Sequence, residues 1–328
     1  MTPSVSPPCR SILHGIGVES VLNLDRWPAL PASDPCETWS IEVHRAQVTD
    51  TYPIELDLEQ VRGTFDHSSD GGREQVALTL TIPRDGSSTR IHADFADRTI
   101  TAHCDIWFPG SEGLLVYVLQ TRVIPALAAL TRDSAVLHAT AVHLPEGAIV
   151  MCGPSGAGKS SLASGLVREG GLLIGDEPVI VDSVAGGSIA QPSVGSLRLD
   201  HDNPASAMLS AQGWLSEPDH QKTVWSPPAS EHWAEPSRVA AILVLGDRLH
   251  GREEPEIAQL APVEAVQALM IDSLLPLHLS GARSMQFRAS AAIVQATPVF
   301  RVSMPDNIQH LPAAVTHLRR HIRGQGMQ

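Results

Sequence analysis

The residues whose types and spacing most clearly indicate a chemical role form one glycine-rich stretch in the middle of the chain. It reads Gly153-Pro154-Ser155-Gly156-Ala157-Gly158-Lys159-Ser160, which is the G-x-x-x-x-G-K-S spacing of a phosphate-binding (Walker A) loop. The glycines allow the backbone to curl without Cβ clashes, so that consecutive N–H groups point inward at phosphate oxygens. An apolar run, residues 148–152, precedes the loop, and a helical pattern follows it. This strand–loop–helix context predicts a nucleotide-phosphate site.

Three side chains at the end of this loop have distinct expected roles. Lys159 is placed to reach the β- and γ-phosphates of a nucleotide, and the Ser160 hydroxyl is placed to ligate Mg²⁺. Ser161 is placed to bond a phosphate nearer the ribose. A helix that begins near Lys159 adds the positive end of its dipole to the same site. We therefore expect residues 153–161 to bind ATP.

A pair of acids follows one helix later. The apolar run of residues 172–175 ends in Asp176-Glu177. Carboxylates at the end of a strand near a phosphate loop commonly bind Mg²⁺ or activate the attacking group. The short spacing predicts that this strand lies close to strand 148–152. Asp247 also follows an apolar run, but the pair already fills the role of the strand-end acid.

The elements around the loop can also be predicted. Leu162, Leu166 and Val167 give the helix that follows one buried face. Upstream, residues 136–142 form a strand that turns into strand 148–152. His138 lies on the first of these strands. It is either a structural histidine or an active-site group that contacts the γ-phosphate or orients the general base.

This compact order resembles the HPr kinase/phosphorylase family and its relatives, including HPr-kinase-like proteins of peptide-modification gene clusters. Residues 136–142 look like the family's His-bearing strand, residues 153–161 like its phosphate loop, and residues 173–177 like its strand with paired acids. The second acid is Glu177, where the bacterial regulators usually have Asp. Residues 191–199 resemble a Pro/Gly-Leu-Arg-Leu segment of the HPr-kinase-like subset.

The resemblance implies roles for individual residues. Asp176 would act as general base toward a serine hydroxyl. Glu177, together with Asp176 and Ser160, would hold Mg²⁺. His138 would belong to the active site beside the catalytic Lys159. Arg198 is a candidate for contacting phosphate or the acceptor, and an arginine packed against a surface carboxylate is the structural alternative.

From these observations we expect an α/β protein in three parts. A β-rich N-terminal domain spans residues 1–112, a connecting helix 113–133, and an HPr-kinase-like P-loop kinase domain with a mixed sheet 134–328. The expected reaction is Mg-ATP-dependent transfer of the γ-phosphoryl group to a hydroxyl. The resemblance favours a serine of a protein or ribosomal peptide precursor, such as a lasso-type precursor. A small-molecule hydroxyl kinase and a non-catalytic ATP-binding regulator are the alternatives.

The remaining elements follow from periodicity. We expect an amphipathic helix over residues 113–131, kinked at Pro125, and we place His143 at the surface. Residues 200–236 are polar, carry three tryptophans and are predicted to form a long loop. Further predicted strands cover residues 39–43, 76–82, 91–95, 179–181, 188–191, 239–245 and 298–302, and further helices cover 262–275, 280–295 and 307–322.

Composition sets broad limits. The chain has 328 residues, of which 43% are hydrophobic and 18% charged, as in folded globular proteins. A net charge of -13 argues against nucleic acid as a partner, because phosphate backbones require Lys and Arg. No apolar run reaches the about 18 residues of a membrane span. The four cysteines lack metal-site or paired spacing, and no secretion signal is recognised, which predicts a reducing cytoplasm. A homo-oligomer is left open.

Overall fold

The computed structural model describes residues 9–20, 22, 24, 38–48, 62–70, 73–81, 88–107, 111–132, 134–194, 196–200, 203–209, 214–215, 222–225, 227–275 and 282–325. The chain divides into two compact units. One holds residues 1–124 and 276–283, and the other holds residues 125–275 and 284–328. The domain boundaries expected at residues 112 and 133 stay a prediction.

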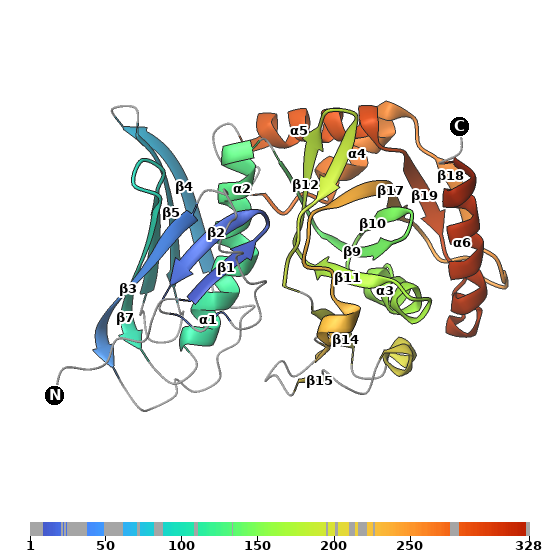
Figure 1. The fold of residues 1–328 in the computed structure, drawn as a ribbon, viewed down its shortest axis with the longest axis horizontal. Helices are drawn as coiled ribbons and strands as arrows, with labels where there is room; N and C mark the ends of the chain where they lie inside the picture. Colours follow the sequence, from blue (N-terminus) through green and yellow to red (C-terminus); the bar gives the residue numbers. More distant parts are fainter. Residues whose placement is uncertain are drawn as a thin grey trace. The chain divides into compact units, whose positions relative to one another are not determined.

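The first unit is built on a seven-stranded sheet in the order β1-β2-β3-β7-β6-β5-β4 (Figure 1). Its pairs are antiparallel except β2–β3 and β3–β7. Alternation explains the strands, because Trp39 and Ile41 are buried while Ser40 and Glu42 are exposed. The strands are β1 (Cys9–Leu13), β2 (Ile16–Ser20), β3 (Thr38–Val48), β4 (Arg62–Asp70), β5 (Arg73–Thr81), β6 (Ser88–Asp94) and β7 (Thr99–Trp107).

The helix predicted over residues 113–131 is divided by a π-helical turn. It consists of α1 (Ser111–Val118), η2 (Leu119–Val123) and α2 (Ile124–Arg132). The N–H of Ile124 donates to the carbonyl of Leu119, five residues back. Pro125 follows directly and has no N–H to donate, so the regular pattern of α-helical hydrogen bonds cannot continue through it. The irregularity therefore lies just before the proline where the kink was expected.

The second unit contains the mixed sheet that was predicted. Its order is β11-β9-β10-β17-β13-β12-β8, with β19 beside β17 and β18 beside β19. Strands β10, β17 and β19 are parallel, and β9 is antiparallel to both β10 and β11. Strands β10, β11, β17 and β19 consequently end at one edge of the sheet. The strands are β8 (Ala135–Leu137), β9 (Ala139–Leu144), β10 (Gly147–Cys152), β11 (Leu172–Asp176), β12 (Val179–Val184), β13 (Gly187–Ala190), β17 (Ser237–Leu245), β18 (Glu256–Gln259) and β19 (Val299–Ser303).

Two predictions about these strands need correction. The strand expected over residues 136–142 is interrupted at His138, whose N–H donates to the carbonyl of Asp272 at 2.7 Å. The interruption lets β8 pair with β12, while β9 pairs with β10 and β11. Strands β10 and β11 were expected to lie close together, and they flank β9 instead. This order places the start of β9 between the end of β10, which precedes the glycine-rich loop, and the end of β11, which carries Asp176.

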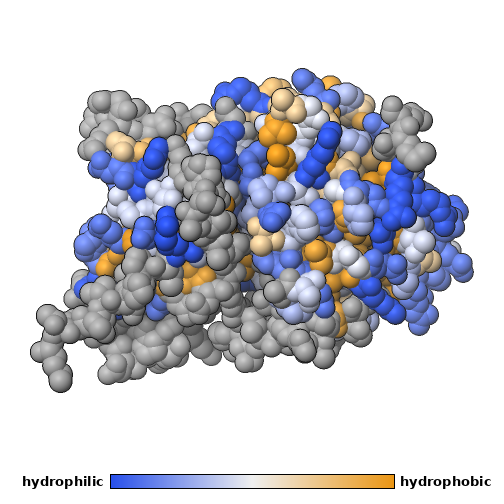
Figure 2. All heavy atoms as spheres, viewed as in Figure 1, coloured by the Kyte–Doolittle hydropathy of each residue, from blue (hydrophilic) through white to orange (hydrophobic). Residues whose placement is uncertain are grey.

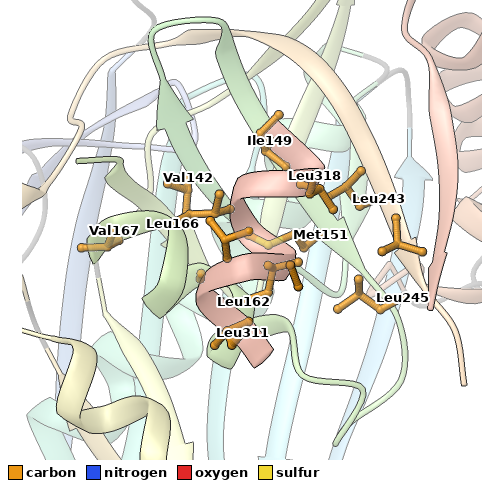
Figure 3. Packing of buried hydrophobic residues seen from close by; sticks show 14 of the residues in the cluster. Val142, Ile149, Met151, Leu162, Leu166, Val167, Leu243, Leu245, Leu311 and Leu318 are labelled. Atoms are coloured by element: carbon orange, nitrogen blue, oxygen red, sulfur yellow. The ribbon is translucent and has the colours of Figure 1, made fainter. Parts of the chain in front are cut away.

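Helices cover both faces of this sheet. One face packs on α3 (Lys159–Arg168) and α6 (Leu311–Gln325), and the other on α4 (Pro262–Ile271) and α5 (Ala282–Ala296). Successive residues of β10 point to opposite faces of the sheet. Ile149 packs in the first core, on the side of α3 and α6, and Val150 packs in the second core, on the side of α4 and α5. Figure 3 shows the first core, in which the labelled residues are Val142, Ile149, Met151, Leu162, Leu166, Val167, Leu243, Leu245, Leu311 and Leu318. These contacts fix the helix that follows the phosphate loop.

The segment 200–236, expected as a long loop, contributes regular structure. A small sheet has the order β14-β16-β15, and Trp225 on β16 is fully buried. The ring of Trp233 stacks on His143 with centroids 3.6 Å apart, so His143 is half-buried and not the surface residue predicted. Burial lowers the pKa of His143. The elements are β14 (Leu197–Asp200), η3 (Pro204–Met208), β15 (Trp214–Leu215), β16 (Lys222–Trp225), η4 (Ala229–Glu231) and, later, η5 (Ile308–His310).

The outer side of α6 is polar. Thr316, Arg320 and Arg323 are exposed there, while Leu311 and Leu318 face the core. Figure 2 accordingly shows hydrophilic side chains along this edge of the molecule. Among the residues that the structure describes, no helix has both the length and the apolar character that a membrane crossing requires.

Candidate functional site

The sheet topology gathers the predicted site residues at one edge. The loop of residues 153–158 follows β10, Asp176 is the last residue of β11, and Glu177 follows it. His138 precedes β9, which runs in the opposite direction and so begins at the same edge. Arg248 lies just beyond the end of β17. The carboxyl ends of strands are the usual binding edge of open α/β sheets, so this edge is the candidate site.

The glycine-rich loop has the conformation that its composition predicts. Gly153, Gly156 and Gly158 have φ angles of 138°, 80° and 98°, values that favour glycine over residues with a Cβ. The N–H of Ala157 donates to the carbonyl of Pro154 at 3.2 Å, which closes the turn inside the loop. Helix α3 begins directly after Gly158. The loop and the helix start together fit a phosphate group.

Lys159 is a buried cation at the centre of the site. Its side chain is only 4% exposed. The ammonium donates to the carbonyl of Gly153 at 2.8 Å and lies 3.4 Å from Glu177 Oε1. It also lies 3.3 Å from His138 Nε2. The lysine therefore links the loop to Glu177 and to His138, three parts that are separate in the sequence.

Glu177 and His138 form the outer part of this cluster. Glu177 Oε1 lies 2.6 Å from His138 Nε2, within hydrogen-bond distance. Glu177 has a φ angle of 32°, which is uncommon for a residue with a Cβ and indicates that the surrounding contacts hold it there. Its carboxylate contacts two nitrogen groups. Its expected role as a metal ligand stays a prediction.

Asp176 is the buried acid of the pair. The Thr140 hydroxyl donates to its Oδ1 atom, and the N–H of Arg198 donates to Oδ2 at 3.3 Å. Burial and the neighbouring charge of Glu177 raise the pKa of Asp176 to about 6, although the two hydrogen bonds and Lys159 oppose the shift. A carboxyl group with a pKa close to neutrality can take and return a proton efficiently.

The other predicted residues occupy the periphery. Arg198 holds Asp176 through its main-chain N–H, and a role for its side chain stays a prediction. Ser160 lies in the first turn of α3 and is partly exposed. The Ser161 hydroxyl accepts a hydrogen bond from the Asn203 amide at 3.1 Å. Asp247, the second strand-end acid, is exposed.

Sequence reasoning missed three residues at this edge. Thr140 was overlooked although it lies opposite Asp176 in the β9–β11 register. Asp272, at the end of α4, is buried, and burial raises its pKa while the charges of His138 and Lys159 oppose that rise. No local motif marks it. Arg248 packs against Gly158, where an added Cβ would overlap its guanidinium. The sequence signal that could have identified Arg248 was its position directly after Asp247, at the end of an apolar strand.

The donor set is suited to a divalent cation. Ser160, Asp176 and Glu177 supply hydroxyl and carboxylate oxygens, the ligands that Mg²⁺ prefers. The charge of Glu177 already raises the pKa of Asp176, so added positive charge would relieve that repulsion. Within the described stretches, no three or more His, Cys, Asp or Glu side chains are grouped for metal binding. Magnesium sites beside phosphates usually take further ligands from the phosphates and from water.

Comparison with known proteins finds a distant structural likeness. A scan against protein-family models and a search of curated proteins found no match. Among solved structures, the Hpr(Ser) kinase/phosphatase from Coxiella burnetii is similar with a TM-score of 0.34 and 14% sequence identity. The match covers 59% of this chain and 99% of the other. Similarity at this level carries no argument about activity, which must be derived from the site itself.

Proposed function

We propose that this protein is an Mg-ATP-dependent kinase that transfers the γ-phosphoryl group of ATP to a hydroxyl. The observation that carries the proposal is the placement of Asp176. It is a buried acid with its pKa raised to about 6, on the same sheet edge as the phosphate loop and the buried Lys159. A phosphate cradle, a buried cation and a proton acceptor together are the parts that phosphoryl transfer requires.

Each group has a defined task in this proposal. The N–H groups of the loop and the Lys159 ammonium bind the phosphates and stabilise the charge that develops on them. Asp176 accepts the proton of the attacking hydroxyl. Thr140 and the Arg198 N–H keep its carboxylate oriented. Ser160 and Glu177 would hold Mg²⁺, which supplies further neutralisation of phosphate charge when bound.

The acceptor is proposed from the sequence resemblance. It favours a serine in a protein or a ribosomal peptide precursor, and His138 and Arg198 would then border the acceptor. A small-molecule hydroxyl uses the same Asp176 and differs only in the surface that surrounds it. A regulator that binds ATP without turnover is the remaining alternative.

The test is a transfer assay with γ-labelled ATP and Mg²⁺. Purified protein is incubated with the short peptides encoded beside its gene, and the products are read by intact mass. We expect a gain of one phosphate on a serine of one peptide. Asp176→Asn should lower the transfer rate about 10²–10⁴-fold and change the ATP affinity less than about threefold. Lys159→Ala should lower both the transfer rate and the ATP affinity.

The outcomes separate the three alternatives. Transfer that survives Asp176→Asn in full would refute the assignment of the base. Transfer to sugars or amino acids but to no peptide would establish the small-molecule kinase. Tight ATP binding without transfer to any acceptor would refute the kinase and leave the regulator.

A further inference from the structure

A pocket opens beside the phosphate loop, and neither Asp176 nor Glu177 lines it. Ser161 and Leu162 of α3 form one wall, and Met304, Ile308 and Leu311 contribute apolar surface opposite. Arg248 lines the same pocket. None of these residues belongs to the Lys159, Glu177 and His138 cluster, so the pocket is a separate feature of the sheet edge.

The wall that carries Arg248 is held in place by main-chain bonds. The loop after β17 and the loop after β19 run side by side, since the Leu249 N–H donates to the Met304 carbonyl at 2.9 Å. The Asp306 N–H returns a bond to the Leu249 carbonyl at 3.2 Å. His250 Nδ1 lies 2.7 Å from Asp306 Oδ2, which ties the same two loops again. The wall is therefore preformed.

Arg248 has a constrained position within this wall. Its Nη1 donates to the Pro305 carbonyl at 3.2 Å, and its Nη2 lies against Gly158, where a Cβ would overlap it. The side chain is half-buried, and burial lowers the pKa of its guanidinium, although Asp306 opposes that shift. One planar cation is thus held between Gly158, at the end of the phosphate loop, and the Pro305 carbonyl.

The site has two ends. Lys159, Glu177 and Asp176 mark the end where a terminal phosphate would react. Ser161, which is expected near the ribose side, borders the pocket. A triphosphate that lies along the loop would therefore direct its remaining atoms into the pocket. Polar groups of Asp306 and Asn307 line the pocket beside Arg248 and the apolar residues. Apolar contacts, hydrogen-bonding groups and one guanidinium plane together suit a flat heterocycle, because arginine stacks on such rings.

We propose that this pocket receives the nucleoside of the bound nucleotide, and that Arg248 stacks its guanidinium on the base. The inference rests on the proposed function, because it assumes that the loop binds a nucleoside triphosphate. It adds a specific claim, namely that the protein distinguishes ATP from a bare triphosphate chain through Arg248.

The experiment compares the affinities of ATP and inorganic tripolyphosphate, each with Mg²⁺, by calorimetry on the full chain. We expect the wild type to bind ATP at least about tenfold more tightly than tripolyphosphate. Arg248→Ala should weaken ATP binding about tenfold and leave tripolyphosphate binding unchanged, which also shows that the variant is folded. Arg248→Lys should lose most of the same preference, because lysine keeps the charge and lacks the plane.

A matched control and the opposing outcomes complete the test. Arg252→Ala removes an exposed arginine four residues further along the same segment and should change neither affinity. If Arg248→Ala weakens the binding of both ligands equally, the arginine interacts with the phosphates and not with the base, and the inference is wrong. If the wild type binds ATP and tripolyphosphate equally tightly, the inference about the nucleoside pocket is also wrong, while the proposal that the loop binds a triphosphate still holds. If the wild type binds neither ligand, the proposed function itself fails and the inference falls with it.

Discussion

At the scale of single residues, Asp176 carries the largest chemical consequence. Its carboxyl is buried next to a second acid, and two hydrogen bonds orient it. Burial disfavours the charged form, whereas the bonds and Lys159 favour it. The resulting pKa of about 6 leaves the group mostly ionised at neutral pH and still able to exchange a proton. Two measurable effects follow.

The first effect is on the pH dependence of transfer. Because the base must be ionised, kcat/KM for ATP should fall toward tenfold per pH unit below about pH 6 and level off above about pH 7. The profile is measured from pH 5 to 8 with the acceptor peptide at a fixed concentration. A rate that does not change across this range would contradict the role of Asp176 as the base.

The second effect is on stability. The pKa of Asp176 in the folded protein, about 6, lies above the unfolded value of about 3.9. The folded state therefore loses stability as pH rises from about 4 to 6, by an amount on the order of 1–3 kcal/mol at pH 7. Asp176→Asn should be more stable than the wild type by that amount at pH 7 and equally stable near pH 4. Urea denaturation at both pH values measures the difference, and a variant that is less stable at pH 7 would show that the buried charge is better compensated than we infer.

At the scale of elements, a register shift in β11 determines where the Asp176 side chain lies. The β9–β11 register shifts between Leu173 and Gly175, which are the residues just before Asp176. Gly175 packs directly on Ser193, whose N–H donates to the Ile174 carbonyl at 3.2 Å. Such irregularities commonly redirect a side chain next to a functional site. Here the close approach at Gly175 allows Asp176 to lie opposite Thr140.

A side chain at Gly175 should disturb this arrangement. A Cβ there would lie 2.5 Å from the Ser193 Cβ, closer than two carbon atoms can pack. Gly175→Ala should therefore cost about 1–3 kcal/mol and lower transfer by displacing Asp176. Denaturation curves and the transfer assay measure both effects.

Ser193→Gly provides the control for this variant. Among the residues that the structure describes, the buried Ser193 hydroxyl has no hydrogen-bond partner, so its removal should cost little by itself. In the double variant it should restore much of the stability that Gly175→Ala loses. If the double variant is as unstable as Gly175→Ala alone, the contact with Ser193 is not the cause.

At the scale of the whole molecule, ligand binding and stability are linked. A ligand that binds only the folded protein stabilises it by about 2.7 kcal/mol at one hundred times its Kd. Mg-ATP should therefore raise the Tm of the wild type by several degrees in a thermal-shift experiment. Lys159→Ala should show a much smaller shift at the same concentration. An equal shift in both proteins would place ATP outside the phosphate loop.

Local patterns in the sequence were sufficient for several features. The phosphate loop, the helix after it and the Asp176-Glu177 pair are read from residues that are neighbours in the chain. The α/β class also followed from alternating and helical periodicities, and the mixed sheet was expected from the family resemblance. These features depend on backbone conformation and on side-chain spacing within about one element, which neighbouring residues determine.

The tertiary structure decided how these parts meet. It placed β9 between β10 and β11 and broke the expected strand at His138. It brought Thr140 and Arg248 to the site from distant elements. It also set the pKa of Asp176, which depends on burial, on the charge of Lys159 from α3 and on hydrogen bonds from β9 and β14 as well as on the adjacent Glu177. Pairing between strands far apart in the chain is selected by the packing of the whole core, so the spacing of residues along the sequence alone could not reveal it.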